Sequence, residues 1–230
     1  MRDSCNQKEK KLMNVAPPSR EKFPSQTDHP TFAAFYNWLA SRTPSFRLVE
    51  PLRRETAGQA YALVLEVGVG TGLNFPFYVA GQVERVEAVD PDAAMLVYAD
   101  RNQTKASVPI TLTQASAEAL PFADQTFDSA VVTLVFCSVT DPMRGLQEVQ
   151  RVLKPGGTLL LFEHVRAQGA MAARLQDALV PLTTRVCGNC HWNRDTLQTV
   201  KAAGFHITRL RELPGVMHPV IVVQATRVER

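Results

Sequence analysis

Three features are missing from this sequence: a long apolar run, a dense basic segment and an apolar stretch near residue 1. A membrane-spanning helix needs roughly 18 or more apolar residues, and no run reaches that length, so we predict no integral membrane segment. No run of Lys and Arg exceeds three residues and the formal net charge is only +3, which argues against nucleic-acid binding. Residues 1–11 are polar, unlike a signal peptide, so we expect a cytoplasmic protein.

Cysteine is scarce as well, with Cys5, Cys137, Cys187 and Cys190 only. The 187–191 segment reads C-x-x-C-H, the pattern of c-type haem attachment. Haem attachment needs an exported chain, a closed zinc site wants four ligands, and a redox C-x-x-C normally opens a helix of a thioredoxin-like unit. Two Cys and one His leave a zinc site incomplete, so we predict no metal and two ordinary thiols in a surface turn.

The composition is that of one globular domain, because 45% of the 230 residues are apolar and 20% are charged. Residues 1–28 are polar and contain three prolines, which predicts a mobile tail. Residues 29–230 are predicted to form a single domain. Its first part, 29–58, is expected to be a helical cover, with Phe32, Phe35, Tyr36 and Leu39 on one helix face.

Strand-like and helix-like segments alternate from residue 60 onward. We predict strands near 62–67, 85–89, 109–113, 128–135, 158–164, 205–212 and 219–226. Such alternation indicates an α/β fold with a mostly parallel sheet and helices on both faces. The last two strands flank Pro214-Gly215 with no helix between them, so the last strand is expected to run antiparallel.

The most informative segment is Leu63–Asn74, an apolar strand followed by a glycine-rich turn. Its glycines are Gly68, Gly70 and Gly72, and Glu66 precedes them. Glycine allows positive φ and a close approach of backbone N–H groups to a ligand. Nicotinamide dinucleotide proteins favour G-x-G-x-x-G, with the third glycine one residue later, so this spacing disfavours a nicotinamide oxidoreductase.

A second carboxylate follows at the end of the next predicted strand. Asp90 lies roughly 20 residues beyond the glycine loop, where an acidic residue can accept hydrogen bonds from both hydroxyls of a ribose. An alternative role is the N-cap of a helix that starts at Ala93. The two roles do not exclude each other.

These segments resemble motifs I and II of the class I S-adenosylmethionine-dependent methyltransferases. Three further blocks resemble the type 11, ubiquinone-methyltransferase-like branch: the adenine-bracketing Ser116–Phe122, the fourth strand at Phe127–Val139, and the E-x-x-R-V-L-K-P-G-G sequence at Glu148–Gly157. The likeness covers about residues 60–165. It implies a Rossmann-like seven-stranded sheet and S-adenosylmethionine as cofactor, with S-adenosylhomocysteine as product.

The resemblance also implies where the cofactor binds. The glycine loop and Glu66 hold the methionine part, Asp90 the ribose, and Ala117 and Glu118 the adenine, while Thr133 offers backbone contacts to the amino-acid end. The full set of expected cofactor-binding residues is Glu66, Gly68, Gly70, Gly72, Asn74, Asp90, Pro91, Ala117, Glu118, Thr133 and Leu134.

A narrower resemblance concerns the methyl acceptor. Segments 72–78, 134–139, 163–165 and 189–197 resemble blocks of a group that includes the membrane-associated alkyl-thiol S-methyltransferases. The sequence departs from that group at Asn189, where Gly is usual, and lacks the group's hydrophobic N-terminal anchor. The likeness implies a small-molecule acceptor, a lipophilic thiol by preference.

Methyl transfer from a sulfonium is an in-line displacement with an activated leaving group, so no catalytic triad is required. His164 and His191 are the candidate catalytic bases because both lie in blocks of the narrower group, and His218 ranks third. The alternatives are a C-, O- or N-methyltransferase acting on a quinone, natural product or phospholipid head group, and a non-catalytic cofactor-binding module. We expect a monomer or weak dimer.

Overall fold

The computed structural model describes residues 30–42, 49–186, 188–215 and 219–228. The predicted 1–28 tail therefore lies outside the described residues, as do Cys5, Cys187 and His218. At the start of the described part, helix α2 (Pro30–Arg42) confirms the helix predicted from the aromatic spacing, and the short helix α4 (Glu50–Glu55) follows.

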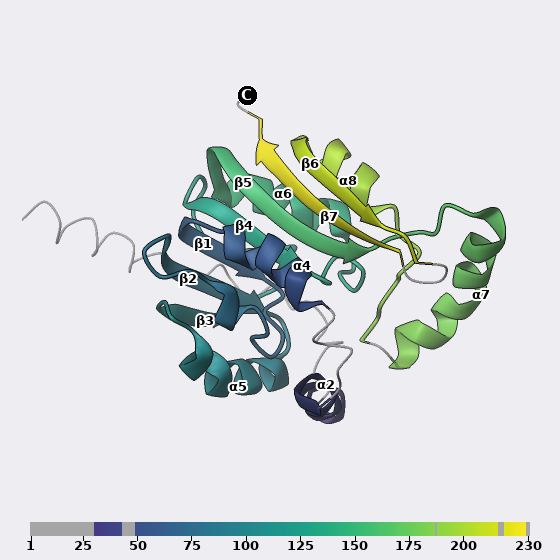
Figure 1. Cartoon of the computed structure of the whole chain (residues 1–230), viewed down its shortest axis with the longest axis horizontal. Helices are drawn as coiled ribbons and strands as arrows, with labels where there is room; N and C mark the ends of the chain where they lie inside the picture. Colours follow the sequence, from purple (N-terminus) through teal and green to yellow (C-terminus); the bar gives the residue numbers. More distant parts are fainter. Residues whose placement is uncertain (1–29, 43–48, 187, 216–218, 229–230) are drawn as a thin grey trace, which may run out of the picture.

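A single seven-stranded sheet forms the centre of the molecule (Figure 1). Its strand order is β3-β2-β1-β4-β5-β7-β6. The first five strands in that order are parallel, whereas β7 pairs antiparallel with both β5 and β6. The fold prediction is therefore confirmed. The strand bounds are β1 Ala62–Val67, β2 Val83–Asp90, β3 Ile110–Gln114, β4 Phe127–Thr133, β5 Leu153–His164, β6 Phe205–Leu213 and β7 Val220–Arg227.

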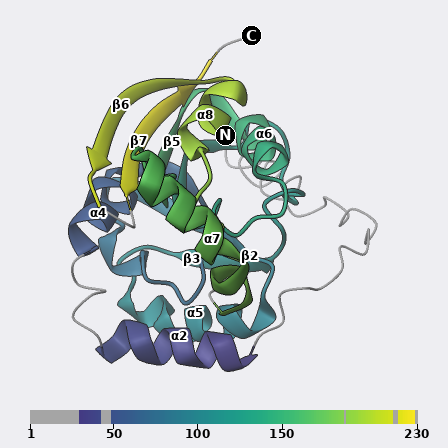
Figure 2. The ribbon, with the colours of Figure 1, turned by 90° about the vertical axis from the view of Figure 1, so that its right-hand side faces the viewer.

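Helices cover both faces of the sheet. Figure 2 shows α4 on one side and α6 and α8 on the other. The helix bounds after α4 are η1 Ala57–Gln59, η2 Phe75–Phe77, α5 Ala93–Asn102, η3 Gln103–Lys105, α6 Pro142–Val152, α7 Ala170–Val186 and α8 Thr196–Ala202, where η marks 3-10 turns.

The core has two main parts because successive strand side chains point to opposite faces. On one face, Leu65 and Val132 pack with Leu146 of α6 and Val200 of α8. On the other, strand residues pack against the η1 and η2 turns and α5, as in the cluster of Val64, Val131, Leu160, Ala57, Phe75 and Ala99. These side chains are almost completely buried, so both faces hold the sheet rigidly.

Two local expectations are corrected by the structure. Phe35 does not share the inward face of α2: it is 56% exposed and stacks on Trp38, while Ala33 is fully buried. The alternative role of Asp90 as a helix N-cap is wrong, because Asp92 caps α5 by accepting hydrogen bonds from the backbone N–H groups of Ala94 and Met95.

The parallel strands place their carboxyl ends at one edge of the sheet. The glycine loop follows β1, Asp90 ends β2, the 134–139 segment follows β4, and His164 ends β5. Helix α7 lies beyond this edge (Figures 1 and 2). Ligands of open α/β sheets bind at such an edge, near the switch in strand order.

Candidate active site at the carboxyl edge of the sheet

The glycine loop combines two packed glycines with one that faces open space. All three have positive φ: +67° at Gly68, +53° at Gly70 and +80° at Gly72. A Cβ on Gly68 would lie 2.5 Å from a methyl carbon of Val135, and one on Gly72 would lie 2.4 Å from the ring of Phe75. A Cβ on Gly70 would meet no atom within 4 Å. The loop thus offers a cradle at Gly70 where a ligand can approach the backbone.

Asp90 borders this cradle. Its carboxylate accepts hydrogen bonds from the Gly70 N–H at 2.8 Å and the Asp92 N–H at 2.9 Å. The residue is 8% exposed, and burial raises the pKa of its carboxyl group to about 6. A carboxylate has about four acceptor positions, so capacity remains for two hydroxyl donors of a ribose.

Glu66 lies deeper than expected for a ligand-contacting residue. It is 1% exposed, and its two oxygens accept hydrogen bonds from the Asn74 amide at 2.8 Å and the Tyr78 hydroxyl at 2.7 Å. Burial raises the pKa of Glu66 to about 7, although both hydrogen bonds oppose the shift. Glu66 therefore fixes the side chain of Asn74, a buried residue of the same loop.

Arg53, on α4, is a charged residue of this site that was not predicted from the sequence. Its guanidinium donates to Asn74 Oδ1 at 2.6 Å and to Thr133 Oγ1 at 3.3 Å, and it is only 5% exposed. It also lies over the Phe162 ring, 5.6 Å from its centroid. Nothing distinguishes Arg53 from Arg54 in the sequence; only the packing of α4 on the sheet brings its positive charge to the edge.

The other predicted cofactor residues occupy the same edge at different depths. Ala117 is buried, and Glu118 accepts hydrogen bonds from the backbone N–H groups of Thr140 and Asp141 and from the Ser116 hydroxyl. Pro91 is exposed. Leu134 directly follows β4 with φ of +59°, a left-handed conformation that turns the chain away from the sheet.

Glu163 fastens this turn to the next strand. One carboxylate oxygen accepts hydrogen bonds from the backbone N–H groups of both Val135 and Phe136. The side chain is fully buried, and burial raises the pKa of Glu163 well above its usual value. The segment that leads to Cys137 is therefore held in a fixed position relative to β5.

The two candidate bases come from different elements. His164 ends β5; burial lowers its pKa, but the neighbouring Cys137 and Glu163 raise it, and the net shift is upward. His191 belongs to the loop between α7 and α8, where its Nδ1 lies 2.8 Å from the carbonyl oxygen of Asn189. The backbone N–H of His191 donates to the Cys137 carbonyl at 2.6 Å, so both histidines lie beside the same segment.

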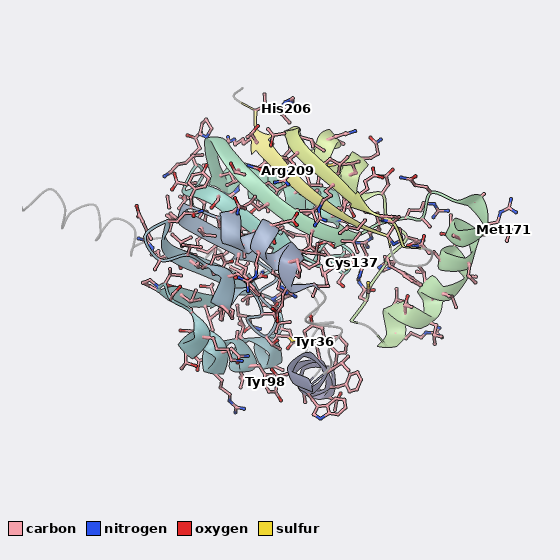
Figure 3. All side chains as sticks on the ribbon, in the orientation of Figure 1. Tyr36, Tyr98, Cys137, Met171, His206 and Arg209 are labelled. Atoms are coloured by element: carbon pink, nitrogen blue, oxygen red, sulfur yellow. The ribbon has the colours of Figure 1, made fainter. Side chains whose placement is uncertain are left out.

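Cys137 is central to this part of the edge. The hydrogen bond with Cys190, together with burial, raises the pKa of its thiol well above the usual value. Figure 3 shows Cys137 beyond the ends of the central strands and Tyr36 on the neighbouring helix α2. The fold thus brings together residues that are far apart in the sequence: Cys137, His164 and the 189–194 loop.

Comparison with known proteins identifies the chemistry of this edge. A family model described as a methyltransferase domain matches residues 65–161. A thiol S-methyltransferase, TMT1B from Rattus norvegicus, is 34% identical over 182 residues, which cover 74% of each chain. The chain belongs to the S-adenosylmethionine-dependent methyltransferases.

One further relative agrees with this assignment, and a solved structure shares the fold. The ubiquinone/menaquinone biosynthesis C-methyltransferase UbiE of Syntrophotalea carbinolica is 34% identical over 66% of this chain and 67% of its own. The solved structure of the N-methyltransferase NodS from Bradyrhizobium japonicum, in complex with S-adenosylhomocysteine, is 15% identical. It covers 87% of this chain and 100% of NodS with a TM-score of 0.63, which supports the fold.

The methyltransferase therefore uses S-adenosylmethionine and methylates a small molecule, as predicted. The open space at Gly70, the Asp90 carboxylate and the buried Arg53 fit a ligand with a ribose and a carboxylate. None of the described helices is both long and apolar enough to cross a membrane.

Proposed function

We propose that this methyltransferase methylates the sulfur atom of a lipophilic small-molecule thiol. One observation carries the proposal: four segments that resemble the thiol S-methyltransferases meet at the carboxyl edge of the sheet. Each segment contributes one residue there, namely Asn74, Cys137, His164 and His191. The identity to TMT1B, which is named a thiol S-methyltransferase, supports the same acceptor.

The proposed cofactor site occupies the β1–β2–β4 side of this edge. Asp90 holds the ribose, and the backbone near Gly70 approaches the ligand closely. Asn74 and Arg53 bind the methionine part, with Glu66 acting through Asn74. The other residues proposed to border the cofactor are Gly68, Gly72, Pro91, Ala117, Glu118, Thr133 and Leu134.

In this proposal the protein positions the acceptor and excludes water from it. When bound, the cofactor supplies a methyl group on a positively charged sulfur. An acceptor thiolate forms a bond to that methyl carbon as the carbon–sulfonium bond breaks, and the bonding pair stays on the leaving sulfur. The thiol proton passes to His164 or His191 or to water. Because a thiol of pKa about 8.5 is already a few per cent ionised near neutral pH, little help from a base is needed.

The N-terminal helix contributes to the proposed acceptor pocket. Phe32 of α2 reaches the loop that follows α7: a Cβ on Gly188 would lie 3.0 Å from its ring. Burial raises the pKa of Tyr36, and Cys137 is close enough to contribute to the shift. These contacts support the 29–58 segment as a cover within one domain, 29–230. Cytoplasmic location and a monomeric or weakly dimeric state stay predictions.

A matched acceptor panel tests the thiol assignment. The purified full chain is incubated with S-adenosylmethionine and either an eight-carbon thiol, the corresponding alcohol, a hydroquinone or phosphatidylethanolamine. We expect a methyl thioether and an equal amount of S-adenosylhomocysteine from the thiol alone, measured by mass spectrometry. If the hydroquinone is methylated on carbon or the phospholipid on its head-group nitrogen, and the thiol is not methylated, the protein is the C- or N-methyltransferase of the alternative.

The variant His191→Gln tests whether the reaction needs a dedicated base. General acid–base catalysis contributes roughly 10²–10⁴-fold when it is required. A thiol acceptor that is already partly ionised should lose less than about tenfold in kcat in this variant. A loss at the upper end of that range would show that the acceptor needs a dedicated base, as a phenol or carbon acceptor does.

A further inference from the structure

Three soft metal-ligand atoms meet beside the proposed acceptor site. The sulfur atoms of Cys137 and Cys190 and a ring nitrogen of His164 all lie within 4.8 Å of one another. Cys137 is buried, whereas His164 and Cys190 are only partly buried, so the cluster has a closed side and an accessible side. Metal binding was not predicted from the sequence because the 187–191 segment alone offers too few ligands, and Cys137 and His164 are distant from it along the chain.

The scaffold holds these three residues in place before any ligand binds. The Arg194 guanidinium donates to the carbonyl oxygens of Phe136 and Val139, both at 2.6 Å. The Asn189 amide donates to the Ser138 carbonyl at 3.0 Å. Together with the backbone bond from His191 to Cys137, these contacts fix the loop of Cys190 against the segment of Cys137.

His164 is tied to the same segment through its neighbour in β5. Glu163 accepts hydrogen bonds from the N–H groups of Val135 and Phe136, and Leu134 N–H donates to the Phe162 carbonyl at 2.9 Å. The second carboxylate oxygen of Glu163 is buried and has no hydrogen-bond partner within the described part of the chain. The three ligand residues thus come from three segments that are all cross-linked by hydrogen bonds.

We propose that Cys137, His164 and Cys190 bind one Zn²⁺ ion and that its fourth position receives the sulfur of the acceptor thiol. Zinc prefers tetrahedral sites of Cys and His, and catalytic sites keep one position open. Bond lengths of about 2.3 Å to sulfur and about 2.0–2.1 Å to nitrogen require ligand atoms roughly 3.5–3.8 Å apart. The ligand atoms lie within 4.8 Å of one another, so a movement of at most about 1.3 Å brings any pair to these separations.

The local charges fit this assignment. Two cysteine thiolates neutralise the ion, and a bound acceptor thiolate gives the site a net charge of −1. Arg194 is close enough to Cys137 and Cys190 for their charges to interact with its guanidinium. Zinc would keep the acceptor deprotonated near neutral pH, because the thiol proton passes to His191 or to water when the sulfur binds the metal. His164, as a zinc ligand, then no longer serves as the base. The role of zinc in binding the acceptor rests on the proposed thiol methylation. The binding of zinc by the three residues does not depend on that function.

Metal binding is tested first, without acceptor or cofactor. The full chain is purified under reducing conditions, stripped with a chelator and titrated with Zn²⁺, and Co²⁺ is used as a coloured substitute. We expect one ion per chain and a thiolate-to-cobalt charge-transfer band. Cys137→Ser, Cys190→Ser and His164→Gln should each weaken binding by about 100-fold or more, since even an outer-shell change costs 10–100-fold. Cys5→Ser is the matched thiol control and should bind normally.

Each variant is checked for folding by its affinity for S-adenosylhomocysteine, which should stay within about threefold of the parent chain. Adding the eight-carbon thiol to the cobalt form should change the band, whereas the corresponding alcohol should not. Failure of the parent chain to bind either ion, or undiminished thiol methylation by the stripped protein, would overturn the zinc proposal and leave the thiol function intact. If the chain binds the metal but does not methylate the thiol, the metal site stands and the assignment of a thiol acceptor is wrong.

Discussion

The carboxyl edge of the sheet has two halves built on different principles. The cofactor half, which we define as Glu66, Gly68–Gly72, Asn74 and Asp90, comes from one continuous stretch of chain and uses oxygen atoms and backbone N–H groups. The sulfur half, which we define as Cys137, His164 and Cys190, comes from three separate segments. A continuous loop can hold a ligand common to a family, while a site assembled from separate segments is free to define an individual acceptor.

The halves touch at Gly68, because a Cβ on this residue would overlap the side chain of Val135. Val135 is two residues before Cys137 and is fixed by Glu163. A change at Gly68 should therefore disturb both halves, whereas a change at Asp90 should disturb only one. Substitutions in the cofactor half and a change of pH test this separation.

Gly68→Ala should cause the largest loss. The new methyl group would overlap the stiff side chain of Val135. Alanine would also have to adopt the left-handed backbone conformation that Gly68 has. We expect the free energy of unfolding to fall by about 3 kcal/mol, the sum of about 1–2 for the backbone and about 1–3 for overpacking. Urea denaturation measures the loss.

Gly70→Ala is the matched control for Gly68→Ala. It carries the same backbone penalty but meets open space, so about 1 kcal/mol of stability should be lost. The affinity for S-adenosylmethionine should nevertheless fall, because the methyl group fills the cradle. Equal stability losses in the two variants would contradict the packing described for Gly68.

Asp90→Asn should separate the halves. Hydrogen bonds to a charged group contribute roughly 1.5–3 kcal/mol, so the affinity for S-adenosylmethionine should fall about 100-fold in calorimetry. Zinc stoichiometry should not change, because the sulfur half is built by other segments. Asp92→Asn is the control: Asn caps a helix about as well as Asp, so its cofactor affinity should stay within about twofold. Parent-like affinity in Asp90→Asn would exclude the ribose role.

A change of pH should lower the cofactor affinity less than Asp90→Asn does. The pKa of Asp90 is raised to about 6 in the folded chain. If the ribose needs the ionised carboxylate, the affinity for S-adenosylmethionine should fall about tenfold from pH 7 to pH 5, and Asp90→Asn should flatten this dependence. Calorimetry at each pH measures both. A flat profile in the parent chain would show that the charge of Asp90 is not used.

Asp90 and Glu66 also contribute to the pH dependence of stability in the ligand-free chain. Glu66 and Asp90 both have raised pKa values, about 7 and about 6, so the folded chain holds more protons than the unfolded chain between about pH 4 and pH 7. The free energy of unfolding contributed by these groups is therefore fully present at low pH and falls as the pH rises through this window.

Sequence patterns predicted the sheet well because its strands are regular. All seven predicted strands exist, and the buried runs such as Val64–Val67 need no distant partner to be recognised as strands. The side of α2 that faces the core could not be predicted from the sequence. Phe35 looked like a core residue by spacing, yet the helix turns Ala33 inward because of what it packs against. The identity of an inward face depends on the neighbouring element, which local spacing does not contain.

The alternating order of strands and helices, the glycine loop and the Asp90 carboxylate can be read from the amino-acid sequence, because each depends on residues close together along the chain. The burial of Arg53, the pairing of Glu66 with Asn74 and Tyr78, and the cluster of Cys137, His164 and Cys190 become visible only in the folded molecule. These contacts join segments far apart in the sequence, and they form only when the parallel strands bring their ends to one edge and the loops after β4 and α7 are hydrogen-bonded to each other.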